Sequence, residues 1–178
     1  MAASSDAGPL IWPAKNSILD ILRKMYPHIM VPEAVYEEAV TRGLEWGFTD
    51  AQVIREAVEE GWIEVCKTDE QIINRVLSVE KRLGVELGEG EREAIVLALE
   101  KRTPTFLTND EDAHQVGSTM GLEPKGVLYL LLRSVKEGCL DGKRVREALK
   151  KMLEGGFWLS PTIIHNFYET LNRLQEPR

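Results

Sequence analysis

The stretch Thr105-Phe106-Leu107-Thr108-Asn109-Asp110 gives the strongest indication of the fold, because a short buried strand runs directly into a polar turn. Residues 29–31 and 62–66 predict two more buried strands, and we expect a further strand at 157–159. Residues 1–5 predict a weak first strand. It should be short, because it contains two serines and no bulky side chain other than Met1.

Helical segments separate these strands. Ile18, Ile21, Leu22 and Met25 have the i, i+3, i+4, i+7 spacing of a helix that buries one face. The same reasoning predicts helices over 33–43, 49–60, 72–83, 90–102, 112–120, 126–137, 141–154 and from 160 onward. This alternation predicts the α/β class, with a central, mostly parallel sheet and helices on both faces.

Length and composition indicate one globular domain over 1–178, with a C-terminal helical extension from about 160, since domains commonly hold roughly 100 to 200 residues. No apolar run approaches the roughly 18 residues that a membrane span needs, and the N-terminus lacks the basic region of a signal peptide. We therefore expect a cytoplasmic protein without a membrane partner. Cys66 and Cys139 are far apart and predict neither a disulfide framework nor a zinc site.

The net charge of −7 argues against a protein that coats nucleic acid, because phosphate binding depends on Lys and Arg. A nucleic-acid partner would require a bound divalent metal or a local basic patch to offset this charge. A segment near 143–151 has such a patch, although patches of this kind are more often a solvated helix face: Lys143, Arg144, Arg146, Lys150 and Lys151.

Acidic residues lie where the predicted strands end, and ligand sites of parallel sheets form at these carboxyl ends. Asp6 follows the first strand, and Asp110 follows the strand at 105–108. Glu38 lies in the helix after strand 29–31, with adjacent Glu37 as the alternative. Glu91 lies in the first turn of the helix near Gly90, with Glu89 as the alternative.

Each acid also has a structural interpretation. Asp6 is typical of a turn, Glu91 is favoured by the helix dipole, and Asp112 is suited to cap the next helix. Together, however, several carboxylates at one sheet edge cannot all stay ionised without a compensating cation. Hard oxygen ligands select Mg²⁺ or Mn²⁺, and such an ion activates water and neutralises charge on a phosphate. The set therefore predicts phosphodiester hydrolysis.

Four segments carry a resemblance to a known family. They are Asp6-Ala7-Gly8-Pro9-Leu10-Ile11, residues 31–38, residues 87–97 and residues 107–114. In this order they resemble the PIN domains, specifically a prokaryotic PIN-like subgroup related to VapC-type toxin ribonucleases. Gly121, Gly126 and the Gly155-Gly156 pair also fit this subgroup. The resemblance covers nearly the whole chain.

The resemblance implies a three-layer PIN-like sandwich and metal-dependent cleavage of single-stranded RNA by a toxin of a toxin–antitoxin pair. It also implies an antitoxin protein as a partner and a homodimer. Asp6, Glu38, Glu91 and Asp110 inherit the catalytic and metal-binding roles. The supporting residues are Thr108, Asn109 and Asp112. Two departures stand out: Asn109 is neutral where a second acid is common, and His114 replaces a common Arg.

These departures keep open the alternative that the chain is a catalytically degenerate PIN-fold module that binds nucleic acid or protein. A phosphotransfer domain would need an acidic pair with a lysine at strand ends, which is not found. No nucleophile elbow, P-loop or zinc-protease motif occurs, and the three histidines lack ligand spacing. The four tryptophans suit stacking on bases, although core or dimer contacts are commoner: Trp12, Trp46, Trp62 and Trp158.

Overall fold

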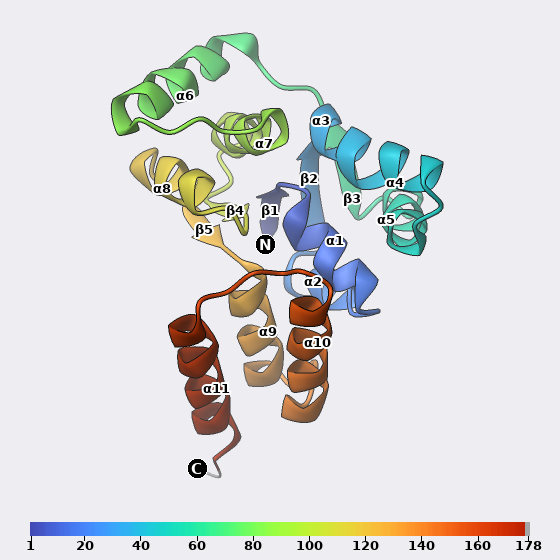
Figure 1. Ribbon diagram of the computed structural model, residues 1–178. Coiled ribbons are helices and arrows are strands. Elements are labelled where there is room, and N and C mark those ends of the chain that lie inside the picture. The colour runs from blue at the N-terminus through green and yellow to red at the C-terminus, as the bar shows by residue number, and fades with distance from the viewer. Residues whose placement is uncertain (177–178) are drawn as a thin grey trace. The chain divides into compact units, whose positions relative to one another are not determined.

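The computed structural model describes residues 1–176 and contains a five-stranded sheet in the order β3-β2-β1-β4-β5. All neighbouring strands run parallel, which confirms the predicted parallel sheet (Figure 1). The strands are β1 (Ala2–Ser5), β2 (His28–Pro32), β3 (Ile63–Cys66), β4 (Thr105–Leu107) and β5 (Glu123–Lys125).

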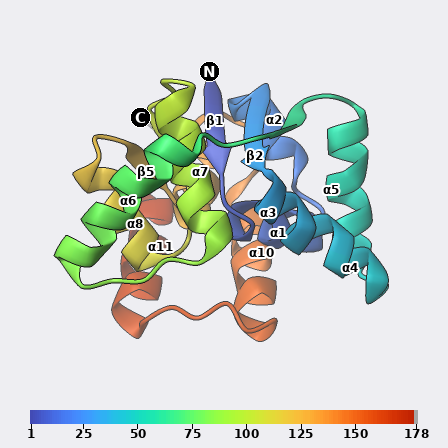
Figure 2. The same ribbon diagram turned by 90° about the horizontal axis from the view of Figure 1, so that it is seen from above.

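Helices cover both faces of this sheet, as the α/β prediction requires. One side carries α6 (Glu70–Leu83), α7 (Glu89–Glu100) and α8 (Glu111–Thr119), which contact one another. The other carries α1 (Gly8–Lys15), α2 (Asp20–Met25) and α5 (Thr49–Glu59) (Figures 1 and 2). The strand order explains this division. The chain adds strands in one direction from β1 to β3 and in the other direction from β4 to β5, and crossovers of the usual right hand then place their helices on opposite faces.

The central strand β1 is built from small residues. It has four residues, so the prediction of a short first strand is confirmed. Ser4 and Ser5 are fully buried, and the Ser4 hydroxyl donates to the carbonyl oxygen of Ala94 at 2.7 Å. Small side chains therefore let α7 pack closely on β1, and the buried hydroxyl is satisfied by the helix backbone.

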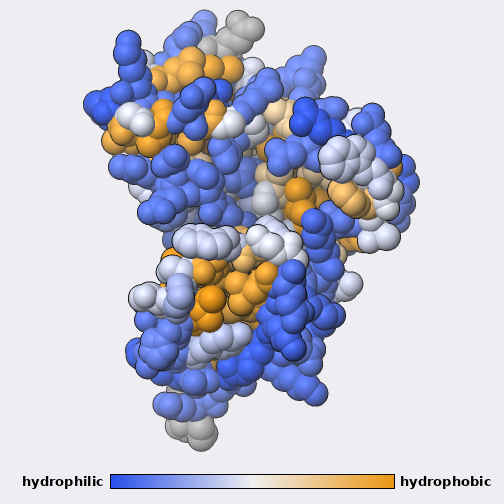
Figure 3. All heavy atoms as spheres, in the orientation of Figure 1, coloured by the Kyte–Doolittle hydropathy of each residue, from blue (hydrophilic) through white to orange (hydrophobic). Residues whose placement is uncertain are grey.

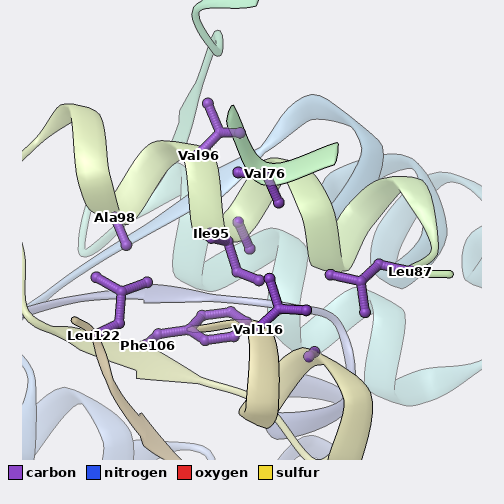
Figure 4. Close-up of a cluster of buried hydrophobic side chains, with 10 residues drawn as sticks. Val76, Leu87, Ile95, Val96, Ala98, Phe106, Val116 and Leu122 are labelled. Carbon is purple, nitrogen blue, oxygen red and sulfur yellow. The ribbon is translucent and has the colours of Figure 1, made fainter. Parts of the chain in front are cut away.

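Helix α7 is the main buried helix of the sheet unit. Every residue from 94 to 98 is fully buried, and Ile95 packs with Val76, Phe106 and Val116 in the cluster of Figure 4. Because this segment is enclosed on all sides, it also fixes the start of the helix, where Glu91 lies.

The helix predicted over 33–43 contains a π-helical turn. Three segments follow without a break: α3 (Glu33–Tyr36), η1 (Glu37–Thr41) and α4 (Arg42–Glu45). The N–H of Arg42 donates to the carbonyl oxygen of Glu37, an i→i+5 bond that encloses one more residue than an α-helical turn. Such turns are frequent at functional sites, and this one carries both Glu37 and Glu38.

The contacts divide the chain into two compact units, residues 1–127 and a helical unit from Leu128 onward. The helical unit contains most of α9 (Val127–Lys136), α10 (Gly142–Glu154) and α11 (Pro161–Gln175). The Arg146 guanidinium in the predicted basic patch donates to Asn172 and Gln175, which joins α10 to α11. The prediction of one domain over 1–178 stays a prediction.

The structure corrects one local expectation and contains two elements that the sequence did not predict. The strand expected at 157–159 is wrong: these residues form no strand, and Trp158 is 81% exposed. Strand β5 and helix α1 were not expected from the sequence, because Glu-Pro-Lys lacks a strand pattern and α1 contains Pro9 and Pro13.

Most helix surfaces that face the viewer in Figure 3 are hydrophilic. Among the described residues, no helix has the length and apolar character to cross a bilayer.

Candidate active site

One pocket of the sheet unit brings together the four acids predicted from the sequence. Asp6 comes from the end of β1, Glu38 from η1, Glu91 from α7 and Asp110 from the turn after β4. Glu37 and Glu89, the two alternatives, also line this pocket. Among the described residues that line it, Arg42 is the single basic side chain.

Asp6 is the most enclosed of these acids, at 6% exposure. Its backbone N–H donates to the carbonyl oxygen of Leu107 at 3.0 Å, which fixes it against β4, and its Oδ1 accepts from the N–H of Gly8 at 3.1 Å. Burial raises the pKa of Asp6 to about 8, with the nearby Glu91 and Glu38 charges adding to this, while hydrogen bonds from Thr108 and Gly8 act to lower it. Asp6 is therefore a buried carboxyl group whose ionised form is disfavoured unless a cation compensates it.

Asp110 is held by the turn that the sequence placed after β4. Its N–H donates to Oγ1 of Thr108 at 3.1 Å, and its Oδ1 accepts from the N–H of Ala113 at 2.7 Å. Thr108 also bonds to the Asp6 carboxyl group, so this hydroxyl connects the two strand ends. Asp110 is thus the N-cap of α8. The capping role considered for Asp112 is wrong.

The charges of Glu91 and Glu38 both act on Asp6, and the choice of these two glutamates over Glu89 and Glu37 stays a prediction. Burial raises the pKa of Glu91, and the charges of Asp110, Glu38 and Asp112 raise it further, whereas the N–H of Gly88, which donates to Glu91 at 2.8 Å, lowers it. Glu37 instead lies 4.0 Å from Nε of Arg42. Glu89 also lines the pocket, and its charge adds to the effect of burial in raising the pKa of Glu93.

Asn109 forms one wall of the pocket. Its Oδ1 accepts from the N–H of Val127 at 2.8 Å, whereas its Nδ2 is buried without a hydrogen-bond partner among the described residues. A Cβ on Gly8 would lie 3.0 Å from this Nδ2, so glycine leaves room for the amide. Asn109 therefore lines the pocket with one amide donor that has no partner among the described residues, and its supporting role stays a prediction.

The sequence reasoning did not single out Gly8 or Arg42, although both line the pocket. Gly8 could have been predicted from its position two residues after Asp6, at the end of the strand. From this position its N–H donates to the Asp6 carboxylate. Arg42 follows Glu38 by four residues, so a helical projection would place both on one face. His114 and Asp112 do not line the pocket.

The donor chemistry of the pocket fits a hard divalent cation. Its acids supply only oxygen ligands, and burial together with neighbouring carboxylates raises the pKa values of Asp6 and Glu91, so that their ionised forms favour a bound cation. Among the described residues, no three Asp, Glu, His or Cys side chains are close enough to form a ready-made metal site. The oxygen donors of the pocket therefore suit a divalent cation, but in the described residues they are not positioned as a complete set of metal ligands.

The raised pKa of Asp6 predicts an unusual pH dependence of stability in metal-free protein. Between the ordinary pKa of 3.8 and the folded value of about 8, the folded state holds a proton that the unfolded chain has released. Raising the pH from 4 to 8 should therefore lower the free energy of unfolding, by on the order of a few kcal/mol. Urea unfolding in EDTA should show this slope, and Asp6→Asn should flatten it; equal slopes would contradict the prediction.

Comparisons with known proteins place the chain in a family. The family model described as DUF3368, a PIN domain, matches residues 3–173. No match was found among curated protein sequences. One similar solved structure is that of VapBC2 from Rickettsia felis, bound to a DNA fragment from the VapBC2 promoter. It superposes on this chain with a TM-score of 0.53 at 12% sequence identity, and the match covers 71% of this chain and 98% of that chain. PAE2754 from Pyrobaculum aerophilum gives 0.50 at 18% identity, over 75% and 97%. Both solved structures are similar to this chain in fold.

Proposed function

The chain belongs to the PIN-domain family, and on this premise we propose that it is a metal-dependent endoribonuclease that cleaves phosphodiester bonds of single-stranded RNA. The observation that supports this most is the pocket that Asp6, Glu38, Glu91 and Asp110 line from four separate elements. Chain segments far apart in sequence deliver carboxylates to one place, which a purely structural role for each acid does not require.

The proposed division of labour follows from the environment of each acid. Asp6, Glu38, Glu91 and Asp110 would hold Mg²⁺ or Mn²⁺, which supplies charge neutralisation on the phosphate and an activated water. Thr108 orients the Asp6 carboxyl group, and the N-cap bond to Ala113 fixes Asp110. Arg42, two-thirds exposed at the pocket rim, offers a cation to the RNA backbone.

The proposal extends to the surroundings of the enzyme. A toxin–antitoxin role, with an antitoxin protein as partner, is supported by the likeness in fold to VapBC2. We also propose that residues 1–178 act as one functional domain, in keeping with the family match over 3–173. The homodimer and the cytoplasmic location stay predictions.

Metal binding should be measurable without any RNA. At pH 8, adding Mn²⁺ or Mg²⁺ at about 100 times its dissociation constant should stabilise the fold by about 3 kcal/mol, because the ion binds the folded state only. For a chain of this length this corresponds to a rise of about 5–10 °C in the unfolding midpoint. Thermal unfolding checks this, and Asp6→Asn should show a much smaller rise. The same rise in both proteins would place the ion elsewhere.

Cleavage itself is tested with pure protein and a set of single-stranded RNAs in Mg²⁺ or Mn²⁺. Cleavage that EDTA stops supports the proposal. If no RNA is cut with either ion, while a nucleic-acid or protein partner still binds, the degenerate binding module is the correct assignment. The partnerless Nδ2 of Asn109, at a position where a second acid is common, is the observation that favours that alternative.

A further inference from the structure

A second hollow lies beside the acidic pocket and carries exposed aromatic rings. Trp46 is 75% exposed and Phe48 is 46% exposed, directly after α4. Their ring centroids lie 5.9 Å apart with an interplanar angle of 70°, so the two rings hold each other edge to face. Side chains of intermediate hydropathy gather over α4 in Figure 3. Two large aromatic rings exposed to solvent forgo the stabilisation that burial would give them. Exposed apolar surface of this kind indicates a binding site for a ligand.

Positive charge accompanies these rings. The Nζ of Lys15 lies 5.3 Å from the ring centroid of Trp12 and 5.8 Å from that of Phe48. Among the described residues no carboxylate lies within ion-pair distance of Lys15, although Glu38 and Asp50 line the same hollow. Arg42 lines it as well. The surface thus combines an aromatic face with two cations, as a nucleotide requires with its base and its phosphate.

The hollow adjoins the acidic pocket directly. Glu38 and Arg42 line both, and both belong to the continuous helical segment 33–45. The η1 turn presents Glu38, and Trp46 ends the helix that follows it. A strand of RNA with a phosphate at the four carboxylates therefore has its neighbouring nucleotide within reach of the rings.

We propose that Trp46 and Phe48, with Lys15 and Arg42, form a base-stacking subsite for the nucleotide next to the cleaved bond of single-stranded RNA. This inference deepens the proposed function and rests on it. Stacking explains why a protein with a net charge of −7 would hold RNA at all, since the rings supply binding that does not depend on net charge. It also predicts little sequence preference at this nucleotide, because every base offers a stacking face.

The test measures binding apart from cleavage. Fluorescence anisotropy of a labelled single-stranded RNA in EDTA gives the affinity, and cleavage in Mg²⁺ gives KM and kcat. Trp46→Ala should weaken binding by roughly 5- to 100-fold and raise KM with little change in kcat. Trp46→Phe should restore most of the affinity. Trp158→Ala is the matched control, because Trp158 is 81% exposed in the helical unit.

An RNA with an abasic site at the stacked nucleotide separates stacking from charge. On this RNA, wild-type protein and Trp46→Ala should bind equally. The proposal is overturned if Trp46→Ala keeps wild-type affinity and KM, if Trp158→Ala weakens binding as much, or if wild-type protein does not bind RNA at millimolar concentration. Unchanged RNA binding would instead assign the rings to a protein partner. Stacking without cleavage under either ion would contradict the proposed nuclease but not the subsite.

Discussion

Asp6→Asn and Asp110→Asn should each reduce cleavage of single-stranded RNA by about 100- to 10,000-fold, the range expected for loss of a metal-holding or proton-transferring carboxylate. Both changes keep the size and shape of the side chain. Asn is also a good N-cap, so Asp110→Asn retains the bond to Ala113 and removes only the charge. The rate of cleavage in Mg²⁺ and Mn²⁺ measures the effect.

The matched control is Asp141→Asn. Asp141 caps α10 through a bond of 2.7 Å from the N–H of Arg144, as Asp110 caps α8, but it lies in the helical unit and lines no part of the acidic pocket. It should cleave at the wild-type rate. Wild-type rates for both Asp6→Asn and Asp110→Asn would remove the site assignment, whereas an equal loss in Asp141→Asn would indicate an effect on folding.

Arg92→Met should lower the free energy of unfolding by about 3–5 kcal/mol, because it leaves a buried carboxylate without its partner. Glu80 is 4% exposed and accepts from Nε of Arg92 at 2.6 Å, from its Nη2 at 2.9 Å and from the N–H of Leu87 at 3.0 Å. The same Nη2 donates to the carbonyl oxygen of Leu87 at 2.7 Å. The Glu80–Arg92 pair thus holds the backbone of Leu87, in the loop that leads to Glu91.

The pH dependence of this pair has the usual sign for a stabilised carboxylate. Burial acts to raise the pKa of Glu80, but the hydrogen bonds from Arg92 and Leu87 outweigh it, so the net pKa is lowered. Its contribution is present at neutral pH and is lost as the pH falls below the ordinary value of 4.5 through the folded pKa. In Arg92→Met this acid-sensitive contribution should disappear.

Urea unfolding at pH 7 measures the effect of Arg92→Met. Arg173→Met serves as the control, since Arg173 and Glu169 form an exposed pair that should contribute less than about 1 kcal/mol. The double variant Glu80→Met with Arg92→Met should regain part of the loss, because it removes the unpaired buried charge. A loss from Arg92→Met no larger than that from Arg173→Met would show that the pair does not stabilise the loop.

The positions of the acids could be predicted because two of them follow strands directly. The rule that parallel strands gather their carboxyl ends at one edge placed Asp6 and Asp110 together, and Thr108 connects them in the structure. The choice of Glu38 over Glu37 depended on resemblance, because the two are adjacent on one helix. The π turn that carries both has no signature in the spacing of apolar residues.

The missed elements share a physical cause, which is that their context determines them. In β5 the residues are Glu123, Pro124 and Lys125, and only pairing with β4 makes this edge segment a strand. The aromatic residues near Trp158 have strand propensity, but no neighbouring strand pairs with them. Helix α1 has its first proline at the N-terminal end, where no N–H is needed, which a reading of prolines as breakers overlooks.

The π turn at Glu37–Thr41 has a consequence for comparing this chain with its relatives. It takes up one residue without changing the phase of the helix on either side, whereas each residue of a regular α-helix turns the chain by about 100°. In an unbroken α-helix of the same sequence, Trp46 would be rotated away from the hollow that it lines together with Glu38. A relative with one residue fewer between these positions would reach the same arrangement with a regular helix, so a single gap at this turn would not by itself change which face carries the residues on either side.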